Sequence, residues 1–287
     1  MSYKIKYFSG FSVTDQEKFA ILSGDFNPVH LDSVYARRSI WGEIAVHGIN
    51  QVLFFLNVFL REKEGLNILT NIKAEFIKPL QIENEFHLSI HEGDKVQAEL
   101  LSKEGDVYSK FTFSYKRIQS YTGKVKHFVF KTQKPSEPNF ESLRNLNFKT
   151  ELLIDENLLK EVYQCLSEKM PLWQVELLTA TTRAVGMKCP GLNSIFSELV
   201  LNFDAEGYSG EEVVFNVTNV HKIFKQIQMD LSGKTVTGFL KTFLRPKPYE
   251  QSTIKELKKL VIREQFKEEK ALVVGGSRGI GEVASKM

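Results

Sequence analysis

The sequence predicts an α+β protein in which two antiparallel sheets each wrap round a buried central helix, with a short Rossmann-like tail. Three observations predict this fold class. An apolar helical segment at about 45–63 is followed by segments in which apolar and polar residues alternate. The same order of elements recurs after residue 150. The last segment, 271–287, is an apolar run that leads into glycines.

The first element is expected to be a helix at Thr14–Leu22. Thr14 and Glu17 have the spacing of a capping box, in which each side chain satisfies the other's free backbone amide, and Gly24 can terminate the helix. The second helix is expected at about Ala45–Lys63. Apolar residues cover most of its circumference, so we expect it to be buried on most sides.

Four strands are expected after this second helix, because the period of the apolar pattern changes to two. The expected strands are 71–76, 84–92, 95–102 and 110–116. Gly93 and Asp94 form a good hairpin turn between the middle two. One buried helix followed by four antiparallel strands indicates a sheet wrapped round a helix.

The second half repeats this order. Helical stretches at 155–168 and 171–185 precede alternating segments at 194–203, 212–220, 222–231 and 234–244. The expected divisions are a first unit at 1–118, a linker at 119–149, a second unit at 150–246, a charged linker at 247–270 and a tail at 271–287. Within the charged linker, a short helix is expected at Ile254–Phe266.

Composition excludes several classes of protein. The chain has 287 residues with 38 Lys and Arg against 35 Asp and Glu, and a net charge of +3 indicates no nucleic-acid footprint. Its longest apolar stretch, Val52–Leu60, is far shorter than the roughly 20 residues of a membrane helix. The N-terminus lacks the apolar region of a secretory signal, and two cysteines suit a reducing compartment. We therefore expect a soluble, cytoplasmic protein that binds neither nucleic acid nor membrane.

The sharpest motif is the segment SGDFNPVHLD at 23–32, which places Asp25 and His30 on either side of Asn27 and Pro28. Pro28 fixes its own φ and keeps Asn27 out of the helical region, so a short rigid turn can aim both side chains at one point. Two such groups can hold one water between them and exchange protons with it. The alternative is a surface turn in which Asp25 caps a backbone and His30 faces solvent.

A second feature is Gly48, which follows His47 at the start of the buried helix. A glycine there lets a ligand approach the backbone, and free amides at a helix N-terminus favour an oxyanion. A packing role at the helix entry is the alternative.

These residues resemble a known family. The string from Ala20 to Asp32, with Tyr35-Ala36 and His47-Gly48 after it, is similar to the MaoC-like (R)-specific enoyl-thioester hydratases (hydratase 2), which have the hot dog fold. The resemblance covers about residues 10–117 and implies a double hot dog with a catalytic first unit. It departs from the family at Trp41-Gly42-Glu43, where relatives have a Pro-containing loop, so the shape of the acyl pocket is open.

The resemblance implies a reaction as well as a fold. Asp25 and His30 would add a water to C3 of a trans-2-enoyl thioester and deliver a proton to C2, while the Gly48 amide forms the oxyanion hole. Asn27 and Ser23 would be supporting residues. The implied partner is an acyl thioester of coenzyme A or of acyl carrier protein, with a homodimer as an open alternative. The chemistry needs no metal, and the sequence has no metal-ligand cluster.

The second unit lacks this motif, and its only histidine, His221, is expected to face solvent or to be satisfied within a strand. It would be a degenerate partner. Cys165 and Cys189 have no base at a suitable spacing and are not candidate nucleophiles. A non-catalytic acyl-thioester-binding module and a hot dog thioesterase are the alternative functions; the spacing of His30 from Asp25 favours the hydratase.

The tail resembles the cofactor turn of short-chain dehydrogenases, with glycines at Gly275, Gly279 and Gly281 after an expected strand. Such glycines allow a tight turn and close approach of a pyrophosphate. The tail is interpreted as the first strand and turn of a truncated reductase domain, in which these glycines are vestigial. No cofactor is therefore expected here, and NAD(P) would bind only alongside a complete reductase domain.

Overall fold

The computed structural model describes residues 2–121, 126–204, 212–261 and 267–287. The strands of the first half are β1 (Ser2–Phe8), β2 (Leu66–Phe76), β3 (Phe86–Glu92), β4 (Val96–Leu101) and β5 (Val107–Ile118). Those of the second half are β6 (Asn147–Glu151), β7 (Ser194–Phe203), β8 (Glu212–His221), β9 (Gln226–Ser232) and β10 (Val236–Leu244). They form one continuous antiparallel sheet in the order β1-β3-β4-β5-β2-β7-β10-β9-β8-β6.

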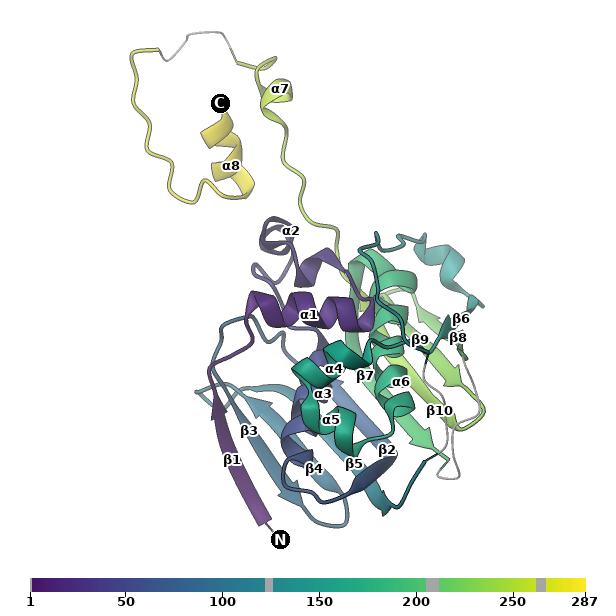
Figure 1. Cartoon of the computed structure of the whole chain (residues 1–287). Helices are drawn as coiled ribbons and strands as arrows, with labels where there is room; N and C mark the ends of the chain where they lie inside the picture. Colours follow the sequence, from purple (N-terminus) through teal and green to yellow (C-terminus); the bar gives the residue numbers. More distant parts are fainter. Residues whose placement is uncertain (1, 122–125, 205–211, 262–266) are drawn as a thin grey trace.

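Helices lie over one face of this sheet (Figure 1). They are α1 (Val13–Ser23), α2 (Ser33–Arg38), α3 (Gly48–Leu60), α4 (Glu156–Val162), α5 (Gln164–Lys169) and α6 (Leu172–Arg183), with α7 (Ile254–Leu257) and α8 (Gly279–Lys286) in the tail. Helices α3 and α6 are the buried centres of the two halves, and their apolar side chains belong to a single core cluster. The expected sheet wrapped round a helix is therefore present twice.

The first helix begins with a different capping box from the predicted one. Ser12, not Thr14, is the N-cap, and its side chain exchanges hydrogen bonds with Asp15, not Glu17. Gly24 terminates the helix as expected, with a left-handed φ of 74°. Both Ser12 and Thr14 are followed three residues later by an acid, so the sequence pattern alone did not separate the two registers.

The structure has two strands that the sequence pattern did not predict, β1 and β6. Both lie at the outer edges of the sheet, where β1 pairs with β3 and β6 pairs with β8. Ile5 and Tyr7 on β1 alternate with Lys4 and Lys6, a period-two pattern that the expected strands did not include. Both apolar side chains are exposed, so β1 has no buried apolar face and is held by its pairing with β3.

The two halves join through β2 and β7, which pair antiparallel from Asn71 opposite Asn202 to Glu75 opposite Glu198. The Lys73 ammonium lies 3.4 Å from the Glu198 carboxylate across this seam. The expected strand at 194–203 is observed with these bounds. Because β2 and β7 pair with one another, neither is an edge strand, and each half covers the inner edge of the other.

The helical region of the second half is broken at two points. The predicted helix at 155–168 divides into α4 and α5 at Tyr163, whose φ of −134° is outside the helical region. Helix α6 ends at Arg183 and continues as a π-helical turn over Ala184–Lys188. Such turns widen a helix locally and are frequent at functional sites.

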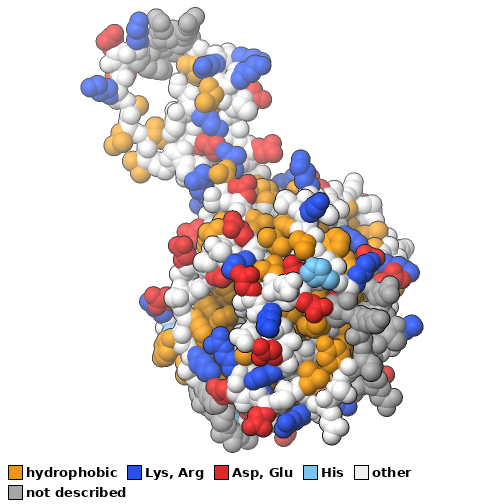
Figure 2. Space-filling model, viewed as in Figure 1, with side chains coloured by type: hydrophobic (Ala, Val, Ile, Leu, Met, Phe, Trp, Pro, Cys, Tyr) orange, Lys and Arg blue, Asp and Glu red, His pale blue; other side chains and the backbone are white. Residues whose placement is uncertain are grey.

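The tail projects from the body of the molecule (Figures 1 and 2). The predicted strand at 271–274 is not formed among the described residues, because no neighbouring strand supplies hydrogen bonds to it. Helix α8 does begin at Gly279, directly after the predicted glycine turn. Of the predicted helix Ile254–Phe266 only α7 is formed in the described part, and residues 262–266 lie outside the described residues.

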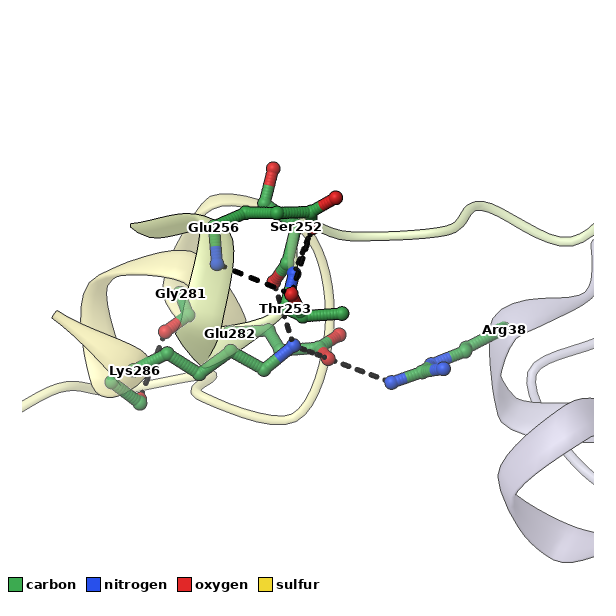
Figure 3. Close-up of polar contacts among 8 residues, drawn as sticks. Arg38, Ser252, Thr253, Glu256, Gly281, Glu282 and Lys286 are labelled. Atoms are coloured by element: carbon green, nitrogen blue, oxygen red, sulfur yellow. Dashed lines mark hydrogen bonds and ion pairs between the residues drawn. The ribbon is translucent and has the colours of Figure 1, made fainter. Parts of the chain in front are cut away.

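One ion pair connects the tail to the body. The Arg38 guanidinium at the end of α2 lies 2.7 Å from the Glu282 carboxylate of α8, and Lys286 contacts the same carboxylate at 2.6 Å (Figure 3). On the face shown in Figure 2, basic and acidic side chains are interspersed. Among the described residues no helix is both long and apolar enough to cross a bilayer.

Candidate active site

The loop after α1 turns Asp25 and His30 toward the same space. Gly24 ends the helix, and its amide donates to the Ala20 carbonyl at 2.8 Å. A single 3₁₀ turn, Pro28–His30, then begins at Asn27, whose side-chain oxygen accepts a hydrogen bond from the Val29 amide at 3.3 Å. Proline at the first position of this turn has its φ already set, so the loop geometry follows from the motif itself.

Asp25 and His30 line a cavity of about 240 Å³ at the junction of the two halves. The first half supplies Asp25, His30, Trp41, Ala45, Val46, Gly48, Gln51, Phe76, Ile77, Lys78 and Pro79; the second supplies Thr182, Val185, Gly186, Ser194, Ile195 and Phe196. The surface-turn alternative for the motif is therefore wrong, since Asp25 is only 1% exposed. Trp41, from the segment that departs from the family pattern, is part of the cavity wall.

The Asp25 carboxylate is held by groups from both halves. The Thr182 hydroxyl donates to Oδ2 at 2.7 Å, and the Asn27 amide donates to Oδ1 at 3.2 Å. Burial raises the pKa of Asp25 to about 6, while the bonds from Thr182 and Asn27 and the charge of Arg183 oppose that rise. A carboxyl group with a pKa near neutrality can both accept and return a proton.

His30 is held in one tautomer. Its Nδ1 lies 2.7 Å from the Ala45 carbonyl oxygen, which can only accept, so Nδ1 carries the proton and Nε2 has a free lone pair. Burial lowers the pKa of His30 to about 4; the bond to Ala45 opposes this shift and the charge of Arg245 adds to it. The ring stacks on His47 with centroids 3.8 Å apart. His30 is therefore neutral at physiological pH and is a hydrogen-bond acceptor at Nε2.

Asp25, His30 and His47 have polar side-chain atoms within 4.8 Å of one another, and such a group could in principle bind a metal ion. However, His47 Nδ1 lies 2.9 Å from Gln16 Oε1, and His47 Nε2 lies 3.2 Å from the Asp25 carbonyl oxygen. Only Asp25 and His30 line the cavity, whereas catalytic zinc sites usually have three protein ligands. The hydrogen bonds therefore favour a water-binding pair, and the absence of a metal stays a prediction.

Gly48 occupies the first position of α3 and also lines the cavity. Amides in the first turn of a helix have no intrahelical partner and lie at the positive end of the helix dipole. Among the described residues, no side chain caps this end of the helix. A Cβ on Gly48 would lie 2.9 Å from the Phe76 ring, so only glycine lets the aromatic wall approach this backbone.

Ser23 and Asn27, the two expected supporting residues, hold the loop that carries Asp25 and His30, and neither lines the cavity. The Ser23 hydroxyl accepts a hydrogen bond from the Asp25 amide at 3.2 Å. The Asn27 side-chain amide donates to the carbonyls of Gly186 and Gly191, at 3.1 and 3.2 Å. Asn27 thus connects the loop to the second half of the chain.

Two residues of the second half approach Asp25 and had no signal in the sequence pattern. Thr182 is the last-turn residue of α6 that donates to Asp25, and Gly186 lies in the π-helical turn that follows. A Cβ on Gly186 would lie only 2.2 Å from Asp25 Oδ1. The second half does not carry the motif, but it forms one wall around the Asp25 carboxylate.

The other singled-out residues lie elsewhere. His221 is exposed at the end of β8 and stacks on Phe224, as expected for a residue outside the site. Burial raises the pKa of the Cys189 thiol to about 12, which disfavours a nucleophilic thiolate. The tail glycines Gly275, Gly279 and Gly281 do not line the cavity.

Comparison with known proteins shows which domain family and fold this chain is similar to. Residues 4–112 match the family model of the MaoC like domain. A solved structure described as a MaoC-like dehydratase is 12% identical, with a TM-score of 0.55 over 84% of this chain and 97% of that one. A MaoC-like dehydratase from Phytophthora capsici is 10% identical, with a TM-score of 0.50 over 86% of this chain and 95% of that one. No curated protein sequence matches the chain.

The first half of the chain therefore contains a MaoC-like domain, and the chain has the hot dog fold of MaoC-like dehydratases. At identities of 12% and 10%, these two solved structures show a shared fold and nothing further. The structural similarity extends over most of the chain and includes the second half, which the family model does not reach.

Proposed function

We propose that this protein is an (R)-specific hydratase or dehydratase that interconverts trans-2-enoyl thioesters and (R)-3-hydroxyacyl thioesters. The observation that carries the proposal is the placement of Asp25 and His30 together on the wall of one cavity, beside the N-terminus of α3 at Gly48. Polar atoms up to 4.8 Å apart can share one water by two hydrogen bonds of ordinary length. The MaoC-like domain over this part of the chain supports the same reaction class.

In the hydration direction, the bound water donates hydrogen bonds to the Asp25 carboxylate and to His30 Nε2. Its oxygen forms a bond to C3 as one of its O–H bonds breaks, and the released proton passes to the pair. The electron pair of the C2–C3 double bond moves onto the thioester as an enolate. The Gly48 amide and the positive end of α3 stabilise that oxyanion. The pair then returns the proton to C2, so one water is added overall.

The protonation states of the two groups suit this sequence. With a pKa of about 6, Asp25 is mostly ionised at neutral pH and can take the proton from water. His30, with a pKa of about 4, is neutral and offers Nε2 as an acceptor. Dehydration is the same path in reverse, with the proton removed from C2 and the 3-hydroxyl leaving as water.

The acyl carrier, the tail and the cellular context belong to the same proposal. We infer that the carrier is coenzyme A or acyl carrier protein, that the protein acts in the cytoplasm on fatty-acyl intermediates, and that a homodimer is compatible with the fold. The start of α8 at Gly279, after a glycine turn, supports an interpretation of the tail as part of a short-chain reductase.

One spectrophotometric experiment tests the proposal and its alternatives. The protein is incubated with trans-2-butenoyl-CoA while the absorbance of the conjugated enoyl thioester and free thiol are both followed. We expect the enoyl absorbance to fall without thiol release. Thiol release would instead identify a thioesterase, and no change in either signal at several carriers and chain lengths would leave a binding module and refute the enzyme.

A further inference from the structure

Gln51 is a polar residue of the cavity wall that is fixed by a hydrogen bond. It lies one turn after Gly48 on α3 and lines the cavity, although it is only 3% exposed. The Ser109 hydroxyl on β5, itself fully buried, donates to Gln51 Oε1 at 2.8 Å. The hydrogen bond joins the central helix to the sheet.

An aromatic stack lies directly behind this pair. One turn further along α3 is Phe55, and two residues further along β5 is Phe111, on the same face of the strand as Ser109. Their rings stack with centroids 5.1 Å apart and an interplanar angle of 4°, and both side chains are at most 1% exposed. The route along α3 that a long acyl chain would follow is therefore filled with packed side chains.

The core offers little room beyond the stack. The next cavity along α3 and β5, lined by residues such as Leu56, Phe59 and Phe113, has a volume of about 10 Å³. That is close to the space of roughly one water molecule, about 10–15 Å³. No acyl segment fits there unless the core moves.

The remaining donor of Gln51 faces the cavity. Gln51 Oε1 accepts the hydrogen bond from Ser109. Among the described residues no acceptor contacts Gln51 Nε2, and this nitrogen is not fully shielded from solvent. When a short acyl group is bound, this amide can donate a hydrogen bond to water or to a substrate oxygen. A long alkyl chain would bury it unpaired, which costs free energy.

We propose that Gln51 is a specificity-determining residue, and that the Gln51–Ser109 pair restricts the site to short enoyl thioesters with acyl groups of about four carbons. The inference rests on the proposed hydratase function and names its substrate class. Gln51 limits length mainly by its bulk, which Ser109 holds in position against the Phe55–Phe111 stack.

The test is a length series on the full chain: kcat/KM is measured with trans-2-butenoyl-, hexenoyl- and octenoyl-CoA. One extra methylene in a closed pocket changes kcat/KM by about 10-fold or more, and hexenoyl-CoA has two methylenes more than butenoyl-CoA. We therefore expect hexenoyl-CoA to fall about 100-fold below butenoyl-CoA, and octenoyl-CoA further still. Gln51→Ala, which opens the end of the cavity by roughly two methylene groups, should raise kcat/KM for hexenoyl-CoA about 10-fold.

Two controls separate length restriction from other effects. Gln51→Leu keeps the bulk but lacks the amide, so it should keep most of the fall in kcat/KM from butenoyl- to octenoyl-CoA, and Gln97→Ala, at an exposed position on β4, should change nothing. A wild type that hydrates octenoyl-CoA as well as butenoyl-CoA would overturn the inference while leaving the hydratase intact, as would an equal gain in Gln51→Leu. Failure to hydrate any of the three substrates would refute the proposed function itself.

Discussion

Asp25 is a buried carboxylate whose pKa the fold raises to near neutral pH. Its 1% exposure removes the water that would stabilise a charge, and the hydroxyl of Thr182 and the amide of Asn27 restore part of that stabilisation. The resulting pKa of about 6 is a balance between these opposing effects. A group in such a balance is sensitive to the loss of a single hydrogen bond.

The catalytic pair is tested by removing each member. Asp25→Asn and His30→Ala should each lower kcat for enoyl-thioester hydration by roughly 10²–10⁴, the usual worth of a positioned acid or base. The double variant should fall little further, because two groups that share one water act as a unit. Near-wild-type kcat in either single variant, with an unchanged circular dichroism spectrum, would show that the assignment is wrong.

Thr182 is tested by the pH profile. Its hydroxyl bond lowers the pKa of Asp25, so Thr182→Val should raise that pKa and move the acidic limb of kcat to higher pH. Since Asp25 must be ionised to accept a proton, we expect roughly a 10-fold loss of kcat at pH 6 and a much smaller loss at pH 8.

The matched control for Thr182 is its neighbour. Thr181 is equally buried, but its hydroxyl donates to the Leu178 carbonyl within α6. Thr181→Val should therefore leave the acidic limb in place, and Thr182→Ser should restore the wild-type profile. An identical profile for Thr182→Val and the wild type would mean that the hydroxyl does not tune Asp25.

At the scale of elements, the end of α6 packs against the loop that carries Asp25 and His30. The helix passes into a π-helical turn over Ala184–Lys188, and the turn carries Gly186 against Asp25. Arg183, at the junction, donates to the Ser23 carbonyl at 2.8 Å and lies over the Phe130 ring. A widened turn of this kind at a helix end is consistent with its placement beside reacting groups.

Gly186→Ala tests this element. The new Cβ would lie 2.2 Å from Asp25 Oδ1, so the carboxylate must move, and we expect kcat to fall by about 100-fold because misplacement by about 1 Å has that effect. Gly93→Ala, in the β3–β4 hairpin, meets its nearest atom at 3.8 Å and should leave kcat unchanged. Equal activity of the two variants would contradict the proposed contact.

At the scale of the whole molecule, the cavity that Asp25 and His30 line requires both halves. The cavity draws its walls from both central helices and from β2 and β7, which pair across the seam. A first half on its own would expose the edge of β2 and would lose Thr182 and Gly186. The second half is therefore part of the active site, although it has no acid–base motif of its own.

This arrangement predicts the behaviour of fragments. Residues 1–118 expressed alone should aggregate or self-pair through the free edge of β2, and should lose most hydratase activity. Residues 1–246 should keep it, because no described residue beyond 196 lines the cavity. His221→Ala in the full chain should also leave kcat unchanged. A stable, fully active monomer of 1–118, measured by gel filtration and the hydration assay, would contradict the shared site.

The tail makes a separate prediction about nicotinamide cofactors. A dinucleotide crevice needs several parallel strands around a switch point, and among the described residues the segment 271–274 is not a strand. Titration of this chain with NADPH or NADH, followed by fluorescence, should therefore show no saturable binding. Micromolar affinity for either would show that the tail forms a cofactor site.

The sequence by itself determined the local features of this protein. The GDFNPVH segment sets its own turn through Gly24, Asn27 and Pro28, so the meeting of Asp25 and His30 could be predicted from seven consecutive residues. The first central helix was predictable from apolar residues on most of its circumference, and the half-buried strands from the alternation that a one-sided apolar face leaves. The edge strand β1 carries the same alternation, in Tyr3, Ile5 and Tyr7, although Ile5 and Tyr7 are exposed, and only the structure shows that it pairs with β3.

Only the tertiary structure decided what surrounds the catalytic pair. Thr182 and Gly186 reach Asp25 from more than 150 positions away, and Ser109 on strand β5 reaches Gln51 on helix α3. Contacts of this kind depend on how the two halves pack. The local sequence around a threonine on a buried helix, or around a glycine in a turn, does not indicate that the residue contacts Asp25. The motif can therefore be recognised in the sequence, whereas the pKa of Asp25 and the length of the cavity arise from the packing of distant segments.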